Sequence, residues 1–503
     1  MTKARISIDR EAVVATIDRR IFGSFVEHLG RCVYDGIYEP GHEHADADGF
    51  RTDVIELVRE LGVSTIRYPG GNFVSGYRWE DGVGPREDRP RRLDLAWHST
   101  ETNEIGLDEF ATWLTKVDSE LMYAVNLGTR GVLEALDVLE YANIRSGTEL
   151  SDQRVANGHP EPHGIRMWCL GNEMDGPWQL GHSTAQEYAQ LASKTARAMR
   201  QIDPDLELVV CGSSSAQMPT FGEWERVVLE ETYDNVDFIS CHAYYEPKGD
   251  DYGSFLASAV NMDRFIDAVV ATADHVKAMR NTDKTIDISF DEWNVWYQSR
   301  YDQVDKITDV DAWPVAPRIL EDSYSVLDAV VFGNLMISLI RHADRVTSAS
   351  LAQLVNVIAP IMTEPGGPAW RQTTFFPFSL TSRLARPVAL ELKLDSPTYV
   401  TERYGEVSLV DAVATHDHES GGTTVFAVNR SLTDAATLTI DSRALGAVTT
   451  VSATSIFDDD IHAANTLEHP DRVAPKENDS VDVSEGAVSV TLPPCSWTVL
   501  TID

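Results

Sequence analysis

Two glutamates stand at the ends of apolar runs that have the composition of buried strands. Glu173 ends the run "IRMWCLGNE" (165–173), and Glu292 lies in the run "IDISFDEWN" (286–294). A strand that builds a core has no structural need for a terminal carboxylate, so each glutamate is a candidate for chemistry. Two carboxyl groups that face one cavity can cleave a glycosidic bond, because one protonates the leaving oxygen while the other attacks or stabilises the reacting carbon.

The neighbouring residues indicate which glutamate does what. Arg67, on another strand-like run, could hold Glu292 ionised, and Tyr244 could donate a hydrogen bond to it. Both contacts suit a nucleophile. Glu173 has no obvious cationic partner and stands beside apolar residues such as Trp168. Desolvation there would raise its pKa, which suits an acid/base.

Further polar residues follow other apolar runs and are expected to face the same cavity. Asn172 could donate a hydrogen bond to a sugar hydroxyl next to the reacting carbon. Asp291 should point away from this cavity, because neighbouring residues on a strand face opposite sides. The other candidates are Glu27, Asn72 and Gln353 for binding, Trp97, Trp178 and Trp296 for packing on a sugar ring, and Arg67 and His242 for support.

The elements that must position these residues alternate along the chain. Helix-like segments lie between most of the strand-like runs, as in 183–202, where Ser183 and Gln186 could form a capping box. Eight such runs predict an α/β fold, a (β/α)₈ TIM barrel, in which the carboxyl ends of the strands carry the active site. The runs are 21–28, 63–71, 121–129, 165–173, 207–215, 237–245, 286–294 and 346–354.

After about residue 380 the sequence becomes rich in Val and Thr, partly alternating and separated by Gly, Asp and Ser. This pattern predicts an antiparallel, jelly-roll-like β-sandwich. The opening segment "ARISIDREAVVATI" also has a strand pattern and is expected to complete the sandwich. We therefore predict a barrel domain over 17–380 and a sandwich domain from 1–16 and 381–503.

Composition limits the partners. The 503 residues carry a formal net charge of −37, so binding to nucleic acid or to an anionic membrane is unfavourable, whereas a neutral sugar meets no such penalty. The N-terminus has no apolar signal-peptide region, which favours a cytoplasmic location. The five cysteines have long spacings and no CxxC pair, which favours buried thiols over disulfides.

The segment "HEHADADG" (42–49) contains residue types that can bind a metal ion, but the spacing of these residues does not fit a metal site. As a calcium loop its first ligand position would be His44, and the twelfth would be Ile55, which is not an acid. As a zinc site it lacks histidines at helical i, i+4 spacing. We therefore interpret the segment as a surface loop and predict no metal for the chemistry.

Four motifs together resemble glycoside hydrolase family 51, the α-L-arabinofuranosidases. They are "FGSFVEHLGRCVYDGIYEP" (22–40), "RYPGGNFVSGYRWEDGVGPR" (67–86), "LGNEMDG" (170–176) and "FDEWNVWY" (290–297), and the resemblance covers nearly the whole chain. It implies an exo-acting, retaining enzyme without metal or organic cofactor, whose members are commonly cytoplasmic hexamers.

The same resemblance implies roles for individual residues. Glu173 is expected to be the acid/base and Glu292 the nucleophile. The residues expected to hold the furanose hydroxyls and orient the carboxylates are Glu27, Asn72, Asn172, Tyr244 and Gln353. Trp97 is expected to line the pocket. A retaining enzyme requires a carboxyl separation of roughly 5 to 5.5 Å, against about 6.5 to 9.5 Å for an inverting one.

Two other functions stay open at this point. One is another retaining glycosidase on the same barrel, such as a β-xylosidase or an endoglucanase. The other is a non-catalytic carbohydrate-binding protein that uses the sandwich as a lectin module, against which the paired glutamates argue. The sequence gives neither the linkage preference (α-1,2, α-1,3 or α-1,5) nor the choice between arabinan, arabinoxylan and short oligosaccharides as substrate.

Overall fold

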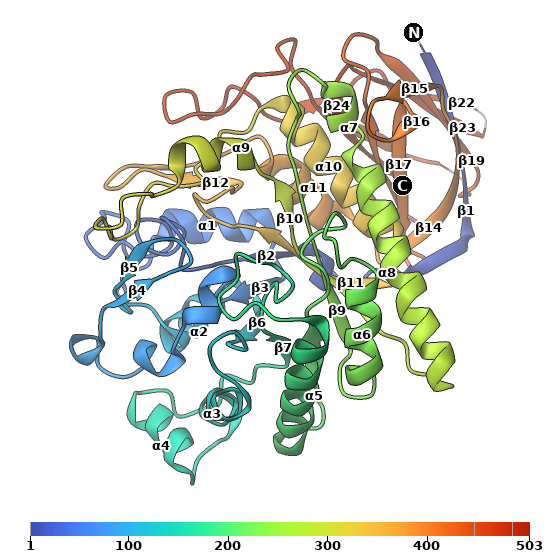
Figure 1. Ribbon diagram of the computed structural model, residues 1–503. Helices are drawn as coiled ribbons and strands as arrows, with labels where there is room; N and C mark the ends of the chain where they lie inside the picture. The colour runs from blue at the N-terminus through green and yellow to red at the C-terminus, as the bar shows by residue number, and fades with distance from the viewer. Residues whose placement is uncertain (1, 447, 485) are drawn as a thin grey trace.

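The computed structural model describes residues 2–446, 448–484 and 486–503, and most of it is a closed barrel of eight parallel strands (Figure 1). Each strand overlaps one of the eight predicted runs, so the predicted barrel is confirmed. Around the barrel the strands are β2 (Gly23–Phe25), β3 (Thr65–Tyr68), β6 (Glu120–Val125), β7 (Met167–Leu170), β8 (Glu207–Val210), β9 (Phe238–Tyr245), β10 (Asp287–Val295) and β11 (Val346–Ala352). Their apolar side chains are buried because helices cover the outside of the barrel.

The helices and short turns connect these strands. The main helices are α1 (Thr52–Leu61), α2 (Leu107–Val117), α3 (Val132–Asn143), α4 (Glu149–Ala156), α5 (Ala185–Ile202), α6 (Glu223–Thr232), α8 (Ser258–Arg280), α10 (Val326–Arg341) and α11 (Phe375–Leu384). Shorter pieces include α7 (Tyr252–Leu256), α9 (Gln298–Arg300), η1 (Arg19–Phe22), η2 (Asn72–Gly76), η3 (Trp79–Gly82), η4 (Arg86–Asp88) and η5 (Tyr301–Asp305). Three two-stranded hairpins project from the loops: β4 (Arg92–Asp94) with β5 (Ser99–Glu101), β12 (Ile361–Thr363) with β13 (Ala369–Arg371), and β15 (Thr398–Thr401) with β16 (Gly405–Ser408).

Among the described residues, the two ends of the chain together form a second sheet of ten strands, which lies beside the barrel at the right of Figure 1. In spatial order the strands are β21 (Lys476–Glu477), β20 (Val451–Ile456), β24 (Ser496–Ile502), β18 (Thr423–Asn429), β17 (Val410–His416), β14 (Val388–Asp395), β1 (Thr2–Thr16), β19 (Ala436–Ala444), β23 (Ala487–Leu492) and β22 (Asp482–Ser484). The sheet has its own apolar core, which includes Ile6, Leu438 and Val490.

The N-terminal strand completes this sheet, as expected, but its two pairings differ in direction. β1 is antiparallel to β14 and parallel to β19, so the curled sheet is mixed where the sequence predicted antiparallel pairing throughout. The reason is topological: neither β14 nor β19 follows β1 directly along the chain, so no hairpin fixes its direction against either neighbour.

Helix α10 joins the two parts. Every residue from Val326 to Ile340 is buried, because the helix packs against barrel strand β10 on one side and sheet strands β17, β18 and β24 on the other. A helix that is apolar all round is expected in such a position.

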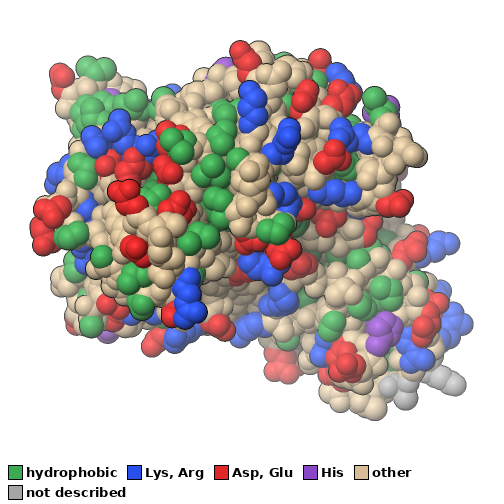
Figure 2. Space-filling model, turned by 90° about the horizontal axis from the view of Figure 1, so that it is seen from below, with side chains coloured by type: hydrophobic (Ala, Val, Ile, Leu, Met, Phe, Trp, Pro, Cys, Tyr) green, Lys and Arg blue, Asp and Glu red, His purple; other side chains and the backbone are tan. Residues whose placement is uncertain are grey.

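Figure 2 shows acidic and basic side chains interspersed over one face of the molecule. All five cysteines are free and buried, as predicted. Within the described ranges, no helix combines the length and the apolar character that a bilayer crossing demands.

Candidate active site

A cavity of about 630 Å³ opens at the carboxyl ends of the barrel strands. Nine of the predicted residues line it: Glu27, Asn72, Trp97, Glu173, Trp178, Tyr244, Glu292, Trp296 and Gln353. The other three, Arg67, Asn172 and His242, are buried behind the lining and hydrogen-bond to its glutamates or to one another. The barrel therefore brings all twelve predicted residues to one place.

Glu292 is held by two donors. Arg67 Nη1 donates to Glu292 Oε1 at 2.8 Å, and the Tyr244 hydroxyl donates to Oε2 at 2.8 Å. Burial, and then the charge of Glu292, raise the pKa of Tyr244 well above its ordinary value, so this phenol keeps its proton and remains a donor. Both contacts are those that the sequence suggested, and both stabilise an ionised Glu292.

Glu173 lies just beyond strand β7 in a turn with positive φ: Gly171 has φ 91° and Glu173 itself has φ 44°. The left-handed region is unfavourable for a glutamate, so the turn stores strain that aims the side chain at the cavity. Trp178 Nε1 donates to Glu173 Oε2 at 2.7 Å, and His242 Nδ1 lies 2.8 Å from Oε1.

The expectation that Glu173 has no cationic partner is therefore wrong. Burial alone would lower the pKa of His242, but the nearby carboxylates of Glu292, Asp291 and Glu173 outweigh it and hold this pKa well above its ordinary value. The imidazolium comes from β9 and reaches past the intervening strand β8 to the end of β7, and so no sequence neighbour of Glu173 indicated the contact.

Asp291 is not among the residues that line the cavity, as expected, but its side chain does not point away from that of Glu292. It was expected to point away from Glu292, yet His242 Nε2 lies 2.8 Å from Asp291 Oδ1, and Arg67 Nε lies 3.8 Å from Asp291 Oδ2. Asp291 and Glu292 thus contact the same two side chains. The pairing register of β10 shifts beside these residues, on both neighbouring strands, and such a bulge breaks the alternation that the prediction assumed.

The two glutamates are close. One carboxylate oxygen of Glu173, one of Glu292 and a ring nitrogen of His242 all lie within 4.8 Å of one another. This spacing favours the short carboxyl separation of a retaining glycosidase over the longer separation that leaves room for a water molecule.

Glu27 also lines the cavity, near Glu292. Its carboxylate accepts hydrogen bonds from Phe73 N at 2.9 Å, from Trp97 Nε1 at 2.8 Å and from Gln353 Nε2 at 3.1 Å. Burial nevertheless dominates and raises the pKa of Glu27 to about 8. Trp97, which comes from the turn between β4 and β5, thereby joins the wall from outside the barrel strands.

The amide of Asn172 has a fixed orientation. Its oxygen accepts from Arg67 Nη2 at 2.7 Å, and its Nδ2 donates to Asn72 Oδ1 at 3.3 Å. Arg67 therefore contacts both Glu292, the nucleophile candidate, and Asn172, which precedes the acid/base candidate Glu173 in the sequence.

Comparison with known proteins identifies the family. A family model described as the α-L-arabinofuranosidase 1 domain matches residues 57–309, and another, described as the α-L-arabinofuranosidase C-terminal domain, matches 291–496. The chain is 60% identical over 509 residues to an exo-α-(1→6)-L-arabinofuranosidase of Bifidobacterium longum, covering 99% of this chain and 97% of that protein.

The chain belongs to glycoside hydrolase family 51, the α-L-arabinofuranosidases.

Two more comparisons support the family 51 assignment. The chain is 60% identical over 499 residues to an intracellular exo-α-(1→5)-L-arabinofuranosidase of Streptomyces lividans, covering 99% of this chain and 75% of that protein. The solved structure of a family 51 α-L-arabinofuranosidase from Bifidobacterium longum superposes with a TM-score of 0.95 at 51% identity, with all of both chains covered. This chain is therefore an α-L-arabinofuranosidase, which decides against the β-xylosidase, endoglucanase and non-catalytic alternatives.

Sequence reasoning missed part of this family 51 pocket. Ser214, Ser215 and Gln217, from the β8–α6 loop, line the side that contains Glu173, and Tyr301 and Lys306 line another part of the rim. Ser214 and Ser215 end the predicted run 207–215 but follow β8, which ends at Val210, and the other residues lie in loops where no apolar periodicity marks a position as facing the cavity.

The side chains of the loop at 42–49 belong to neither group of metal-ligating side chains found among the described residues. Asp46 and Asp48 accept from Lys116 Nζ at 2.6 and 2.7 Å, and His42 Nε2 contacts Gly367 O at 2.9 Å. In the pocket, Glu173, His242 and Glu292 could together hold an ion by distance alone. Arg67 and His242 already compensate those carboxylates, which leaves little electrostatic advantage for a metal there.

Proposed function

We propose that this α-L-arabinofuranosidase releases terminal L-arabinofuranosyl groups from arabinan- and arabinoxylan-derived oligosaccharides by double displacement, with retention of configuration. The observation that carries the proposal is the position of Glu173 and Glu292, whose oxygens approach within 4.8 Å in one sugar-sized cavity. A covalent intermediate requires this closeness, because the nucleophile and the acid must reach the same glycosidic bond.

The proposed first step is an attack by Glu292 on the anomeric carbon. Arg67 and Tyr244 both donate to Glu292, so they keep it ionised and aimed. Glu173 protonates the leaving oxygen as the bond breaks. In the second step Glu173 acts as a base and activates a water molecule, which releases arabinose from Glu292.

The proposed binding contacts use the other predicted residues. Glu27 and Gln353 form one polar wall, and Asn72, Asn172 and Tyr244 supply donors and acceptors near the reacting carbon. Trp296 packs edge-on against Tyr244, with ring centroids 5.0 Å apart. Trp97, Trp178 and Trp296 give the cavity apolar faces on which a furanose ring can pack.

The substrate is tested with a panel of glycosides. Rapid release of the aryl group from an aryl α-L-arabinofuranoside, with no release from the matching β-xyloside or β-glucoside, is the expected result. Arabinose release is then compared between α-1,5- and α-1,6-linked arabino-oligosaccharides, because the two relatives at 60% identity carry different linkages in their names. Faster cleavage of the xyloside would reject the proposed substrate.

The roles of the two glutamates are tested by separate alanine variants. Glu173→Ala should keep measurable activity on substrates with very good leaving groups, because these leave without protonation. Glu292→Ala should lose nearly all activity on every substrate, because no intermediate can form. Equal losses in both variants on all substrates would contradict the assignment.

The proposal extends to location and assembly. The Streptomyces relative is named intracellular, so we propose a cytoplasmic enzyme that acts on oligosaccharides. A homo-oligomer, and specifically the hexamer that the family resemblance implied, stays a prediction. Light scattering on the eluting protein would test it, with a mass six times that of one chain expected.

We also propose the domain division 17–380 and 1–16 with 381–503. Its support is that β1 pairs only with β14 and β19, and that all twelve site residues fall within 17–380. On this division the sheet domain contributes no side chain to the chemistry.

A further inference from the structure

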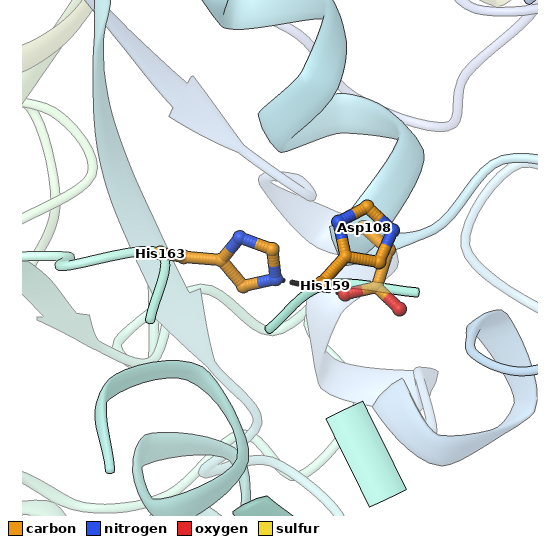
Figure 3. A group of neighbouring side chains, drawn as sticks. All are labelled: Asp108, His159 and His163. Carbon is orange, nitrogen blue, oxygen red and sulfur yellow. Dashed lines mark hydrogen bonds and ion pairs between the residues drawn. The ribbon is translucent and has the colours of Figure 1, made fainter. Parts of the chain in front are cut away.

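A second group of metal-ligating side chains lies outside the catalytic pocket. Asp108 is in the first turn of α2, and His159 and His163 are in the segment that connects α4 to β7. One ligand atom from each of the three residues lies within 4.8 Å of the other two. Figure 3 shows the imidazole of His163 directed at the Asp108 carboxylate, with the His159 ring beside it.

The carboxylate of Asp108 is already fixed in place. His163 Nε2 lies 2.8 Å from Asp108 Oδ1, and the Tyr141 hydroxyl donates to Oδ2 at 2.6 Å. Asn157 Nδ2 in turn donates to the Tyr141 oxygen at 2.9 Å. The side chains of Asp108 and His163 are only 4% and 8% exposed. Hydrogen-bonded partners of this kind orient ligands in metal sites.

The segment that carries the histidines is also held. The buried side chain of Arg154 donates to the carbonyl oxygen of His159 at 3.0 Å, and to those of Tyr141, Ile144 and Arg145 at 2.6 to 2.7 Å. The imidazole of His159, by contrast, has no hydrogen bond to any of the described residues. The backbone of His159 is therefore fixed, while its ring nitrogens remain available.

We propose that Asp108, His159 and His163 bind a divalent transition-metal ion of the zinc class. Two imidazole nitrogens and one carboxylate oxygen form a ligand set that Zn²⁺ prefers, and His159 is half-exposed, so a water molecule can complete a tetrahedron. On binding, any proton between His163 Nε2 and Asp108 Oδ1 passes to solvent, and each atom then ligates the ion.

The site ties two parts of the barrel together. The segment with the histidines leads directly into β7, whose far end carries Asn172 and Glu173, and Asp108 belongs to the neighbouring helix α2. The ion therefore holds the start of β7 against the barrel wall, and β7 is the strand that presents the acid/base Glu173. Its effect is on stability, because it lies outside the catalytic cavity.

Isothermal titration of the full-length protein with Zn²⁺ tests the proposal. The test variant is His159→Ala, because His159 has no side-chain hydrogen bond to lose among the described residues. The matched control is His418→Ala, which removes one histidine from the His416–His418 pair elsewhere on the molecule. We expect about one ion per chain from this site in the wild type and the control, and at least about tenfold weaker binding in His159→Ala.

The same proteins give two further readouts. Co²⁺ in place of Zn²⁺ should give visible absorption bands of a tetrahedral site in the wild type and the control only. At the same concentration, Zn²⁺ should raise the Tm of the wild type and the control more than that of His159→Ala, since an ion stabilises the folded state in proportion to how tightly it binds there. Ions bound at Glu173, His242 and Glu292 would give equal signals in all three proteins.

Circular dichroism and arabinofuranosidase activity show whether each variant is folded. If His159→Ala does not fold, Asp108→Asn is used in its place, because asparagine keeps the shape of the aspartate side chain. The same weaker zinc binding is then expected of Asp108→Asn. Equal zinc affinity in the folded variant and the wild type would overturn the proposal. So would the lack of zinc binding by the wild type at concentrations up to about 1 mM.

Discussion

At the scale of single residues, the pocket is an arrangement of buried charges that compensate one another. Arg67 and His242 lie among Glu173, Asp291 and Glu292, so each carboxylate has a positive neighbour. The types of these residues at strand ends could be predicted from sequence, and so could the contact between Arg67 and Glu292. The contact of His242 with Glu173 could not, because it joins two strands that are not neighbours in the sheet and leaves no mark in the local sequence.

Glu27 makes a pH-dependent contribution to stability whose sign follows from its environment. Burial raises its pKa in the folded protein to about 8, from about 4.5. The stabilisation is complete below about pH 4.5 and is lost as the pH rises through the folded pKa, because the unfolded chain releases the proton first. The free energy of unfolding therefore carries a downward slope of up to about 1.4 kcal/mol per pH unit in this window.

The variant Glu27→Gln should remove that slope, since an amide does not ionise. Urea unfolding of both proteins, at pH values from about 5 to about 8, measures it. The wild type is expected to lose stability relative to Glu27→Gln as the pH rises. If plots of the free energy of unfolding against pH were parallel for the two proteins, Glu27 would have to be ionised in the folded state over the whole pH range.

At the scale of elements, the barrel was predictable because strands covered on both faces are apolar along their whole length. Finer features, such as the residues that cap a helix, could not be predicted reliably from the sequence. For α5 the predicted capping box, Ser183 with Gln186, is wrong, because the cap lies one residue later. Thr184 Oγ1 accepts from Glu187 N, and Glu187 Oε2 accepts from Thr184 N. A charged glutamate at the third position also interacts favourably with the helix dipole, as glutamine does not.

The loop after β3 must approach the nucleophile closely. A Cβ at Gly71 would lie 2.9 Å from Glu292 Oε1 and 3.3 Å from Glu27 Oε2. Arg67 and Tyr244 hold Glu292, so it cannot move aside without losing those bonds. Gly71→Ala should therefore reduce kcat by about tenfold or more, since a displacement of this size at a reacting group is costly.

The matched control on the same loop is Gly76→Ala. Its Cβ would meet only Leu180 Cδ1, at 3.7 Å, which is ordinary contact. Steady-state kinetics on an aryl arabinofuranoside should give near wild-type kcat for Gly76→Ala and a strong decrease for Gly71→Ala. Similar kcat values for the two variants would mean that Glu292 has more freedom than its contacts indicate.

At the scale of the whole molecule, the sheet domain packs on α10 through a close contact. A Cβ at Gly333 would lie 2.3 Å from Trp497 Cδ1, and Trp497 is fully buried. The composition of the two ends of the chain predicted that they form one β domain. It did not predict the parallel pairing of β1 with β19, because residue alternation is the same for either strand direction.

Gly333→Ala sets two effects against each other. Alanine gains about 1 kcal/mol over glycine in a helix, while overpacking of a rigid core typically costs about 1–3 kcal/mol. Because the indole ring cannot move without separating β24 from α10, we expect the clash to dominate. Thermal unfolding should show a Tm lowered by a few degrees. A raised Tm would mean that the contact between barrel and sheet adapts easily.

The central claim is that Glu292 forms a covalent arabinosyl intermediate while Glu173 serves first as acid and then as base. The most direct measurement is the anomeric configuration of methyl arabinofuranoside formed in the presence of methanol, read by NMR, because this product does not interconvert between anomers. Two inversions at one carbon predict the α anomer. The β anomer would require a single displacement and would contradict the account.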